Sequence, residues 1–509
     1  MRSWAGWLLG LIGVSLGLVV LHLPLLDLPY YWDEAGYYIP AALDFLHSGL
    51  LIPQSTLTTG HTPLVPVYLA TMWHLFGYSP VVTRAAMLLF AAATITALYA
   101  LARFVVNREV AVWSALLLAL SPVFFAQSSL AHLDLTAGLF TTLAVLTLLR
   151  QSRSAGPVFA LAASLAVLSK ETAVVLLPGA WAFAWFRRKE RRAFAWVWLT
   201  LPLLPLLAWA VYYHHVTGFW TGNREYLDYN LYSALHPVRI FLSLLRRLHQ
   251  FFIGGFNWLL VAGAGLGIWW AAKNRPAPPP GAPDEETRRR RGDFLFLAVG
   301  LTAVYILMLS VVGGAILRRY FLPVFPLFFL LAVMFLFHLP KRLARSVVLV
   351  VAVCFSGSWF LNPPYPFPFE DNLAYADFVR LHQQAAQYLE SQPGQPRILT
   401  AWPASDELAR PFLGYVHRPL RVVSIRGFRP EDFRGVSPDS FDLLYLYSRK
   451  WEPAHNLLMR IPFLQKLQTR YFDYAPQARD ESLAAQYGLR LLRQLERRGQ
   501  WVRIYAKRE

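Results

Sequence analysis

Long apolar runs recur along the first two thirds of this chain, and they restrict the folds that it can adopt. The first runs from about Trp4 to Leu26. A helix of about 20 residues, rising 1.5 Å per residue, crosses the hydrocarbon core of a bilayer. The chain is 56% hydrophobic and only 15% charged, whereas about 25% of the residues of a soluble protein are charged. The sequence therefore predicts a mainly α-helical, polytopic membrane protein.

The apolar runs predict about eleven transmembrane helices. We interpret the first as a retained helix, because no small-residue cleavage motif precedes Asp27. The predicted spans that follow are about 82–104, 110–125, 135–149, 158–168, 172–186, 194–213, 256–272, 294–312, 321–339 and 346–361. Several are short and must pack within a bundle. The apolar segment Leu64–Phe76 is shorter still, and it predicts a helix lying at the membrane interface.

Clusters of Lys and Arg follow every second predicted span, and such clusters mark cytoplasmic loops. They fall within residues 103–108, 150–153, 187–192, 273–291 and 341–345. This register predicts a multi-pass protein with a cytoplasmic N-terminus, and we expect it in the cell inner (plasma) membrane. The Pro-rich segment 276–283 predicts an extended linker. Because cytoplasmic loops account for the net charge of +18, that charge does not indicate a nucleic-acid partner.

The composition changes at about Asn362, where a Pro-rich linker precedes a mixed polar and apolar stretch. We predict a transmembrane domain over residues 1–361 and an extracytoplasmic, soluble α/β domain over residues 362–509. The second domain has a predicted helix at about 373–392 and strand-like runs at 397–401, 441–447 and 501–505. With one cysteine, Cys354, the chain can form no intrachain disulfide.

Ionisable side chains gather at the predicted outer ends of five segments. Two carboxylates lie within an aromatic stretch, residues 30–38, which we call the acidic segment. The full set is Asp33, Glu34, His61, His132, Asp134, Lys170, Glu171, Arg318 and Arg319. Charge is tolerated at any helix end, but that alone does not favour carboxylates, histidines, a lysine and an arginine pair on one side. The set predicts a shared site at the outer membrane surface.

These residue types suit group transfer. A carboxylate can take a proton from a hydroxyl or amine acceptor as it attacks an electrophilic carbon. Arginine and lysine can stabilise the negative charge of a departing phosphate. A site at the membrane surface further implies that the phosphate-linked donor is a lipid.

Four short motifs resemble those of the GT-C membrane glycosyltransferases, and more closely those of the protein O-mannosyltransferase and lipid A aminoarabinose transferase group (family 39-like). They are Asp-Glu-Ala-Gly-Tyr at 33–37, His-Thr-Pro-Leu at 61–64, Ser-Lys-Glu-Thr at 169–172 followed by Pro178, and Arg-Tyr-Phe-Leu-Pro at 319–323. In the second, Thr62 stands where the family has proline. The resemblance covers about residues 1–360. It implies an inverting transfer from a polyprenyl-phosphate sugar to a lipid, glycan or protein acceptor.

The resemblance also implies roles for individual residues. Asp33 is expected to be the catalytic base or the carboxylate that orients the acceptor. Glu34 is the second catalytic candidate of this pair, although it points elsewhere because adjacent residues do not share a face. If one of the two is only a helix cap, Glu34 is the better candidate. Asp134 is expected to be a second catalytic carboxylate, with an N-cap of the following span as the alternative. Tyr37 and His61 are expected to line the site or contact the acceptor.

The donor phosphate is expected to contact Lys170, Arg318 and Arg319, with Tyr320 donating a hydrogen bond. For Arg319 the alternative is a side chain that only snorkels to the interface. No cofactor is assigned. A divalent metal stays open, because it would need three or four converging ligands that spacing alone does not identify.

A transporter or flippase is the competing interpretation. Such a protein places its ionisable residues near the bilayer midplane, commonly on broken helices within internal repeats. Here these residues lie at one predicted surface and the sequence contains no repeat, so we favour the glycosyltransferase.

Overall fold

The computed structural model describes residues 4–150, 152, 154–187, 196–274, 285–452, 461–472 and 476–508. Contacts divide the chain into two compact units, Met1–Pro24 with Ala41–Leu361, and Leu25–Pro40 with Asn362–Glu509. The predicted boundary after residue 361 recurs in this division, but residues 25–40 group with the C-terminal domain and not with the helix before them. The predicted basic run 188–192 and Pro-rich linker 276–283 lie outside the described residues.

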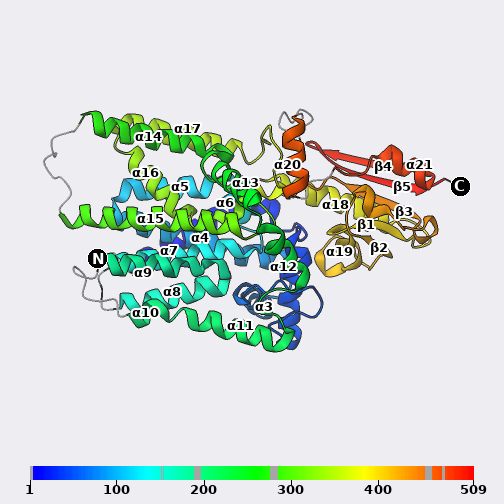
Figure 1. Cartoon of the computed structure of the whole chain (residues 1–509), viewed down its shortest axis with the longest axis horizontal. Helices are drawn as coiled ribbons and strands as arrows, with labels where there is room; N and C mark the ends of the chain where they lie inside the picture. Colours follow the sequence, from blue (N-terminus) through cyan, green and yellow to red (C-terminus); the bar gives the residue numbers. More distant parts are fainter. Residues whose placement is uncertain are drawn as a thin grey trace. The chain divides into compact units, whose positions relative to one another are not determined.

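The first unit is a bundle of apolar helices (Figure 1). Within the described residues, five segments are long and apolar enough to cross a membrane: Ala5–Leu25, Pro80–Val105, Trp196–Thr217, Pro237–Asn274 and Glu285–Val311. Shorter apolar helices are Leu64–Phe76, Leu133–Leu149, Ala155–Ser169, Glu171–Phe186 and Phe325–Leu336. The chain is therefore a multi-pass membrane protein.

The helices of the N-terminal half have the following bounds: α1 (Trp4–His22), α2 (Ile39–Ser48), α3 (Leu64–Phe76), α4 (Pro80–Val105), α5 (Arg108–Leu120), α6 (Pro122–Gln127), α7 (Leu133–Leu149), α8 (Ala155–Ser169), η3 (Glu171–Val175), α9 (Leu176–Phe186), α10 (Trp196–Thr200) and α11 (Leu203–Thr217). They are followed by α12 (Arg224–Asn230), α13 (Pro237–Leu248), α14 (Asn257–Asn274), α15 (Glu285–Val311), η7 (Arg318–Phe321), α16 (Phe325–Leu336) and α17 (Lys341–Gly357).

The position of each helix in the bundle follows from the distribution of its apolar residues. α7 is apolar on all sides and buried along nearly its whole length, packing against α4 and α8. α1 instead leaves large side chains such as Leu9 and Val20 more than 60% exposed. An apolar surface of this kind requires an apolar surrounding such as lipid.

The helices depart from the predicted spans at two places. The predicted span 110–125 is divided into α5 and α6, because Pro122 lacks an amide hydrogen and starts a new helix. The loop expected between residues 214 and 255 contains α12 and α13. In α13 the arginines Arg239 and Arg247 are buried while Phe241 and Leu245 are exposed. This inverts the usual amphipathic pattern, so it does not resemble a helix of a soluble protein.

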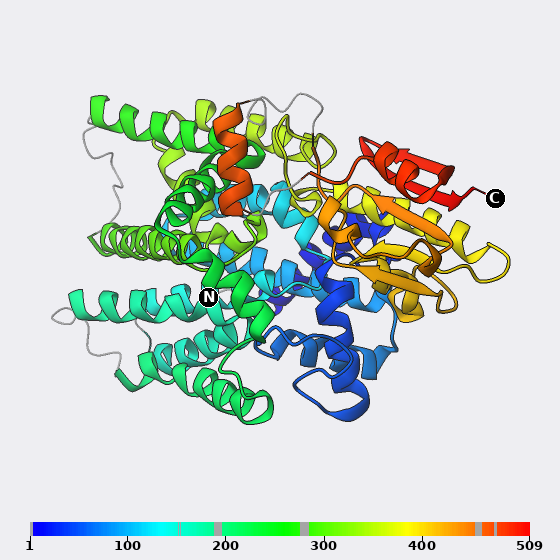
Figure 2. The ribbon, with the colours of Figure 1, turned by 45° about the vertical axis from the view of Figure 1, so that its right-hand side comes forward.

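The second unit contains one five-stranded sheet of order β2-β1-β3-β5-β4. Its strands are β1 (Ile398–Ala401), β2 (Val422–Ile425), β3 (Leu443–Tyr447), β4 (Leu489–Arg497) and β5 (Gln500–Lys507). The first three are mutually parallel, and β5 runs antiparallel to β3 and β4. Figure 2 shows the β4–β5 hairpin in red at the edge of this sheet.

In the part of this unit that the structure describes, the sheet is accompanied by the α-helices α18 (Ala374–Glu390), α19 (Ala404–Ala409), α20 (Pro462–Phe472) and α21 (Asp480–Tyr487). Every residue of β1 and β3 is buried, as in parallel strands covered on both faces. The sequence predicted β1, β3 and β5; it missed the short β2 and the largely exposed, charged β4. The predicted fold class, a helical membrane protein with a C-terminal α/β domain, is confirmed.

Candidate functional site

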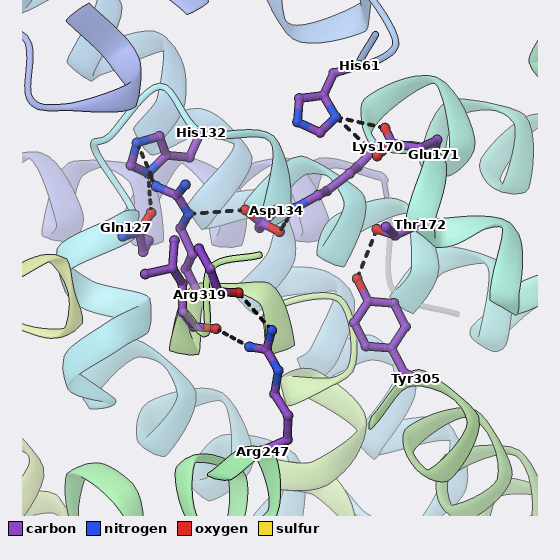
Figure 3. A network of polar contacts seen from close by, with 12 residues as sticks. His61, Gln127, His132, Asp134, Lys170, Glu171, Thr172, Arg247, Tyr305 and Arg319 are labelled. Atoms are coloured by element: carbon purple, nitrogen blue, oxygen red, sulfur yellow. Dashed lines mark hydrogen bonds and ion pairs between the residues drawn. The ribbon is translucent and has the colours of Figure 1, made fainter. Parts of the chain in front are cut away.

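Asp134 is the centre of a buried charge cluster in the first unit. It lies in the first turn of α7, and its side chain is only 3% exposed. The Nζ of Lys170 donates to its Oδ1 at 2.6 Å, and the Nε of Arg319 lies 3.6 Å from its Oδ2. Figure 3 shows the two cations approaching the carboxylate from opposite sides. One carboxylate between two cations leaves an excess of positive charge, so the cluster can accept an anion.

Lys170 reaches Asp134 because α8 ends immediately before it. Its backbone is extended, with φ −157°, and η3 begins at the next residue. The Lys170 ammonium also lies 4.1 Å from the centre of the Tyr320 ring, a favourable cation–π distance. The structure thus brings together four residues predicted for the site, Asp134, Lys170, Arg319 and Tyr320, which we call the Asp134 cluster.

Arg319 is held by His132, which belongs to the predicted outer set but was given no role, and through it by Gln127, which was not predicted. Its Nη1 lies 3.0 Å from each ring nitrogen of His132. The Nδ1 of His132 lies 2.6 Å from Oε1 of Gln127. Because that oxygen only accepts, we assign the hydrogen to Nδ1, which leaves Nε2 to accept from Arg319. Gln127 and His132 thus orient the guanidinium toward Asp134.

Arg318 points away from its neighbour. Its Nη2 donates to the Gly254 carbonyl at 2.6 Å and its Nε to the Gln250 carbonyl at 3.2 Å. A Cβ at Gly255 would collide with this guanidinium, and Gly255 has φ +55°. The structure therefore places Arg318 outside the Asp134 cluster, where it ties η7 to the chain before α14.

The segment that precedes Arg319 is fixed by Arg247 of α13. Its Nη1 and Nη2 donate to the carbonyls of Leu317 and Ala315 at 3.0 and 2.9 Å (Figure 3). Gln250 donates to the Ile316 carbonyl between them at 2.9 Å, so side chains satisfy the backbone carbonyls of residues 315–317. Sequence reasoning missed Arg247 because it assigned this region to a loop.

His61 pairs with Glu171, the residue after Lys170. The Nδ1 of His61 lies 2.9 Å from Oε2 and 3.1 Å from Oε1 of Glu171. The His61 loop is held by Thr62, whose hydroxyl donates to the Val167 carbonyl at 3.0 Å, and by Trp209, which donates to the Gly60 carbonyl at 3.1 Å. The predicted residue His61 therefore lies beside the Asp134 cluster (Figure 3).

The remaining predicted residues, Asp33, Glu34 and Tyr37, belong to the second unit. Glu34 is buried, and its Oε2 accepts the Tyr31 N–H at 2.9 Å. Asp33 is half-buried and makes no capping hydrogen bond to the π-helical turn Glu34–Tyr38 that follows. Glu34 is therefore bonded to the backbone three residues before it.

No metal site is added by the fold. Among the residues that the structure describes, no three His, Cys, Asp or Glu side chains come together as ligands of a metal ion. The divalent metal that the sequence left open is therefore given no set of ligands by the described residues.

Asp134→Asn is expected to destabilise the protein strongly. The change leaves Lys170 and Arg319 buried without a counter-ion, which typically costs about 3–5 kcal/mol. Thermal unfolding in detergent measures the effect. The matched control is Glu109→Gln, because Glu109 pairs with Arg345 at 2.7 Å with both side chains partly exposed, and such pairs contribute about 0–1 kcal/mol. Equal shifts in Tm for the two variants would contradict this account of the cluster.

Comparisons with known proteins find one family model and several solved structures that are similar to this chain. Residues 60–213, which include Asp134 and Lys170 of the Asp134 cluster, match the family model described as dolichyl-phosphate-mannose-protein mannosyltransferase. The crystal structure of ArnT from Cupriavidus metallidurans bound to undecaprenyl phosphate is similar over 99% of this chain and 98% of ArnT, with TM-score 0.56 and 15% sequence identity. The chain has the fold of the GT-C membrane glycosyltransferases. The resemblance drawn from its motifs is thereby confirmed.

Further solved structures show weaker likeness. ArnT from the same organism in the apo state gives a TM-score of 0.54 at 16% identity and 98% coverage of both chains. The archaeal oligosaccharyltransferase AglB from Archaeoglobus fulgidus gives 0.47 at 13% identity, over 82% of this chain and 65% of AglB. A sequence comparison with curated proteins found no match.

Proposed function

We propose that this protein is an integral-membrane glycosyltransferase that moves a sugar from a polyprenyl-phosphate donor to a lipid, glycan or protein acceptor on the extracytoplasmic face. One observation carries the proposal: Lys170 and Arg319 converge on the buried Asp134 in a chain with the ArnT fold. The solved ArnT structure is described as bound to undecaprenyl phosphate, which supports a lipid phosphate as the ligand of the corresponding cluster.

The Asp134 cluster suits a phosphate for electrostatic reasons. Its cations are almost fully buried, and charge interactions are stronger there than in water. The N-terminus of α7 adds a partial positive charge at the same place. When the sugar–phosphate bond breaks, the phosphate gains negative charge. Preorganised cations stabilise that charge as it develops, which lowers the barrier.

The proposed reaction is a single inverting displacement. The acceptor oxygen or nitrogen forms a bond to the anomeric carbon from the face opposite the phosphate. The carbon–oxygen bond to phosphate breaks, and the phosphate keeps the electron pair. The acceptor proton passes to Asp33 as general base.

The proposed membrane orientation is supported by contacts between the predicted cytoplasmic loops. Arg345 at the start of α17 pairs with Glu109 at the start of α5. The guanidinium carbons of Arg150 and Arg290 lie 5.8 and 4.6 Å from the centre of the Phe104 ring. Four basic clusters that were assigned to one side by their sequence spacing thus meet at one end of the bundle, which supports a cytoplasmic N-terminus.

The proposal is tested by donor cleavage. Purified protein in nanodiscs is incubated with polyprenyl phosphates carrying a hexose, a pentose or an aminosugar, together with membrane extract as acceptor source. Release of free polyprenyl phosphate from one of these donors is the expected result, and the donor that reacts identifies the sugar. Uptake of a sugar or lipid into proteoliposomes without cleavage of any donor would instead support the transporter.

A further inference from the structure

The acidic segment is bound to the C-terminal domain by its backbone. The Tyr30 N–H donates to the Leu413 carbonyl at 3.2 Å, and the Tyr415 hydroxyl donates to the Tyr30 carbonyl at 3.1 Å. Both backbone groups of Tyr30 are therefore satisfied by residues that follow it by more than 380 positions. This explains why residues 25–40 form one compact unit with residues 362–509.

Trp402 lies directly against the turn that follows Asp33. A Cβ at Gly36 would lie 2.7 Å from Cζ2 of the Trp402 indole, so only glycine allows this approach. The same indole packs against Trp32 and Tyr37, with ring centres 5.2 and 5.8 Å apart. It therefore contacts the residue before Asp33 and two residues of the turn after it.

The indole is itself oriented by α19. The Trp402 side chain hydrogen-bonds the carboxyl group of Asp406, which lies in α19. Burial raises the pKa of Asp406, opposed by Arg410 and by the bond from Trp402. Because the indole nitrogen can only donate, Asp406 fixes the direction in which the ring faces.

α18 also packs against the acidic segment, through Phe378. The Phe378 ring centre lies 5.5 Å from that of Tyr31 and 5.7 Å from that of Trp32. His382 stacks on Phe378 at 3.8 Å, and its Nδ1 lies 2.5 Å from Oε2 of Glu407 in α19. This buried pair joins α18 to α19, so Phe378 of α18 and Trp402 before α19 support the acidic segment together.

The backbone next to Asp33 needs such support. Trp32 has φ +45°, a conformation that residues other than glycine rarely adopt. A residue stays in this region only when its surroundings hold it there. The rings of Phe378 and Trp402 contact the Trp32 indole, and the Arg449 guanidinium carbon lies 5.7 Å from its centre. Because Asp33 is the next residue, the packing that holds Trp32 also sets the direction in which the chain presents the Asp33 side chain.

We propose that Trp402 is a positioning residue for Asp33. Trp402 acts by packing against the turn at Gly36, a contact that we call the Trp402 clamp. The hydrogen bond to Asp406 holds the indole in this position. This inference rests on the proposed function, in which Asp33 takes the proton of the acceptor. It adds that removal of the clamp impairs turnover while leaving donor binding intact, since Lys170 and Arg319 belong to the other unit.

The test compares Trp402→Ala with Trp501→Ala, a half-buried tryptophan of β5 in the same domain. Hydrogen exchange followed by mass spectrometry reports on residues 30–38 independently of activity. Trp402→Ala is expected to speed exchange there at least about tenfold and to lower kcat by about 10- to 100-fold, the size of effect that small misplacement produces. KM for the donor should not change. Trp501→Ala should leave all three quantities unchanged, and Trp402→Phe should restore part of kcat.

Every other outcome contradicts one identifiable step of the proposal. Unchanged exchange over residues 30–38 in Trp402→Ala overturns the clamp. Faster exchange with normal kcat overturns the positioning role, provided that Asp33→Asn is inactive. If Asp33→Asn is instead fully active, the proposed base assignment fails and not the clamp. Should Trp402→Ala fail to fold, Asp406→Asn is the second variant, because it keeps the size of the side chain and weakens the bond that orients the indole, and Arg410→Gln controls for the ion pair that it also removes. It is expected to lower kcat about 3- to 10-fold, as the weakening of one hydrogen bond predicts, and an unchanged kcat overturns the inference.

Discussion

Asp33→Asn is expected to lower sugar transfer by about 10²- to 10⁴-fold, the contribution of a positioned general base. Asparagine has the size of aspartate but cannot take the acceptor proton. The measurement is the rate of polyprenyl phosphate release under saturating donor, with expression and thermal stability checked in the same preparation. Donor affinity should be unchanged, because the proposed phosphate ligands are Lys170 and Arg319.

Glu34→Gln is the matched control for this experiment. Glutamine keeps an oxygen that can accept the Tyr31 N–H, the bond that Glu34 makes at 2.9 Å. We therefore expect less than about a tenfold loss, as is typical when one hydrogen bond is weakened. Equal losses in Asp33→Asn and Glu34→Gln, with both proteins folded, would exclude Asp33 as the unique base.

Arg319→Ala is expected to weaken binding of polyprenyl phosphate by about 10- to 100-fold. Hydrogen bonds to charged groups contribute about 1.5–3 kcal/mol, and each 1.4 kcal/mol corresponds to about a tenfold change in Kd. Titration of the purified variant with undecaprenyl phosphate measures the loss. Arg345→Ala is the control, since that arginine is half-exposed and pairs with Glu109. Wild-type affinity in Arg319→Ala would mean that Arg319 only stabilises the buried cluster and does not bind the donor phosphate.

Most of the helical bundle could be predicted because an apolar run of membrane length has few alternatives. α4 and α7 begin and end within about two residues of their predicted spans. α13 could not be found in this way. Its arginines, including Arg247, face inward to backbone carbonyls, while Phe241 is exposed. Only the tertiary structure shows which polar groups those arginines satisfy.

Part of the site could be predicted from residue chemistry. The sequence does not show, however, which of two adjacent residues of the same type faces the site. Arg318 and Arg319 are adjacent and identical, yet one holds the Gly254 carbonyl and the other faces Asp134. The positioning residues Gln127 and His132 act through side-chain geometry, which no spacing rule encodes.

The grouping of the acidic segment with the C-terminal domain was also beyond the sequence. The contact of Tyr415 with Tyr30 joins residues 385 positions apart, so no local periodicity reports it. Only the glycine at position 36 hinted at a close approach, and glycine alone does not name the partner. Long-range packing of this kind must be seen in the folded chain.

The central claim is that the Asp134 cluster binds a lipid-linked phosphate, and thermal stabilisation tests it most directly. A ligand that binds only the folded state stabilises it by RT ln(1 + [L]/Kd), or about 2.7 kcal/mol at 100 times Kd. We predict that undecaprenyl phosphate raises the Tm of the wild-type protein, that undecaprenol without phosphate does not, and that Arg319→Ala needs more lipid for the same rise. Equal stabilisation by undecaprenol and its phosphate, or none by either, would contradict the account.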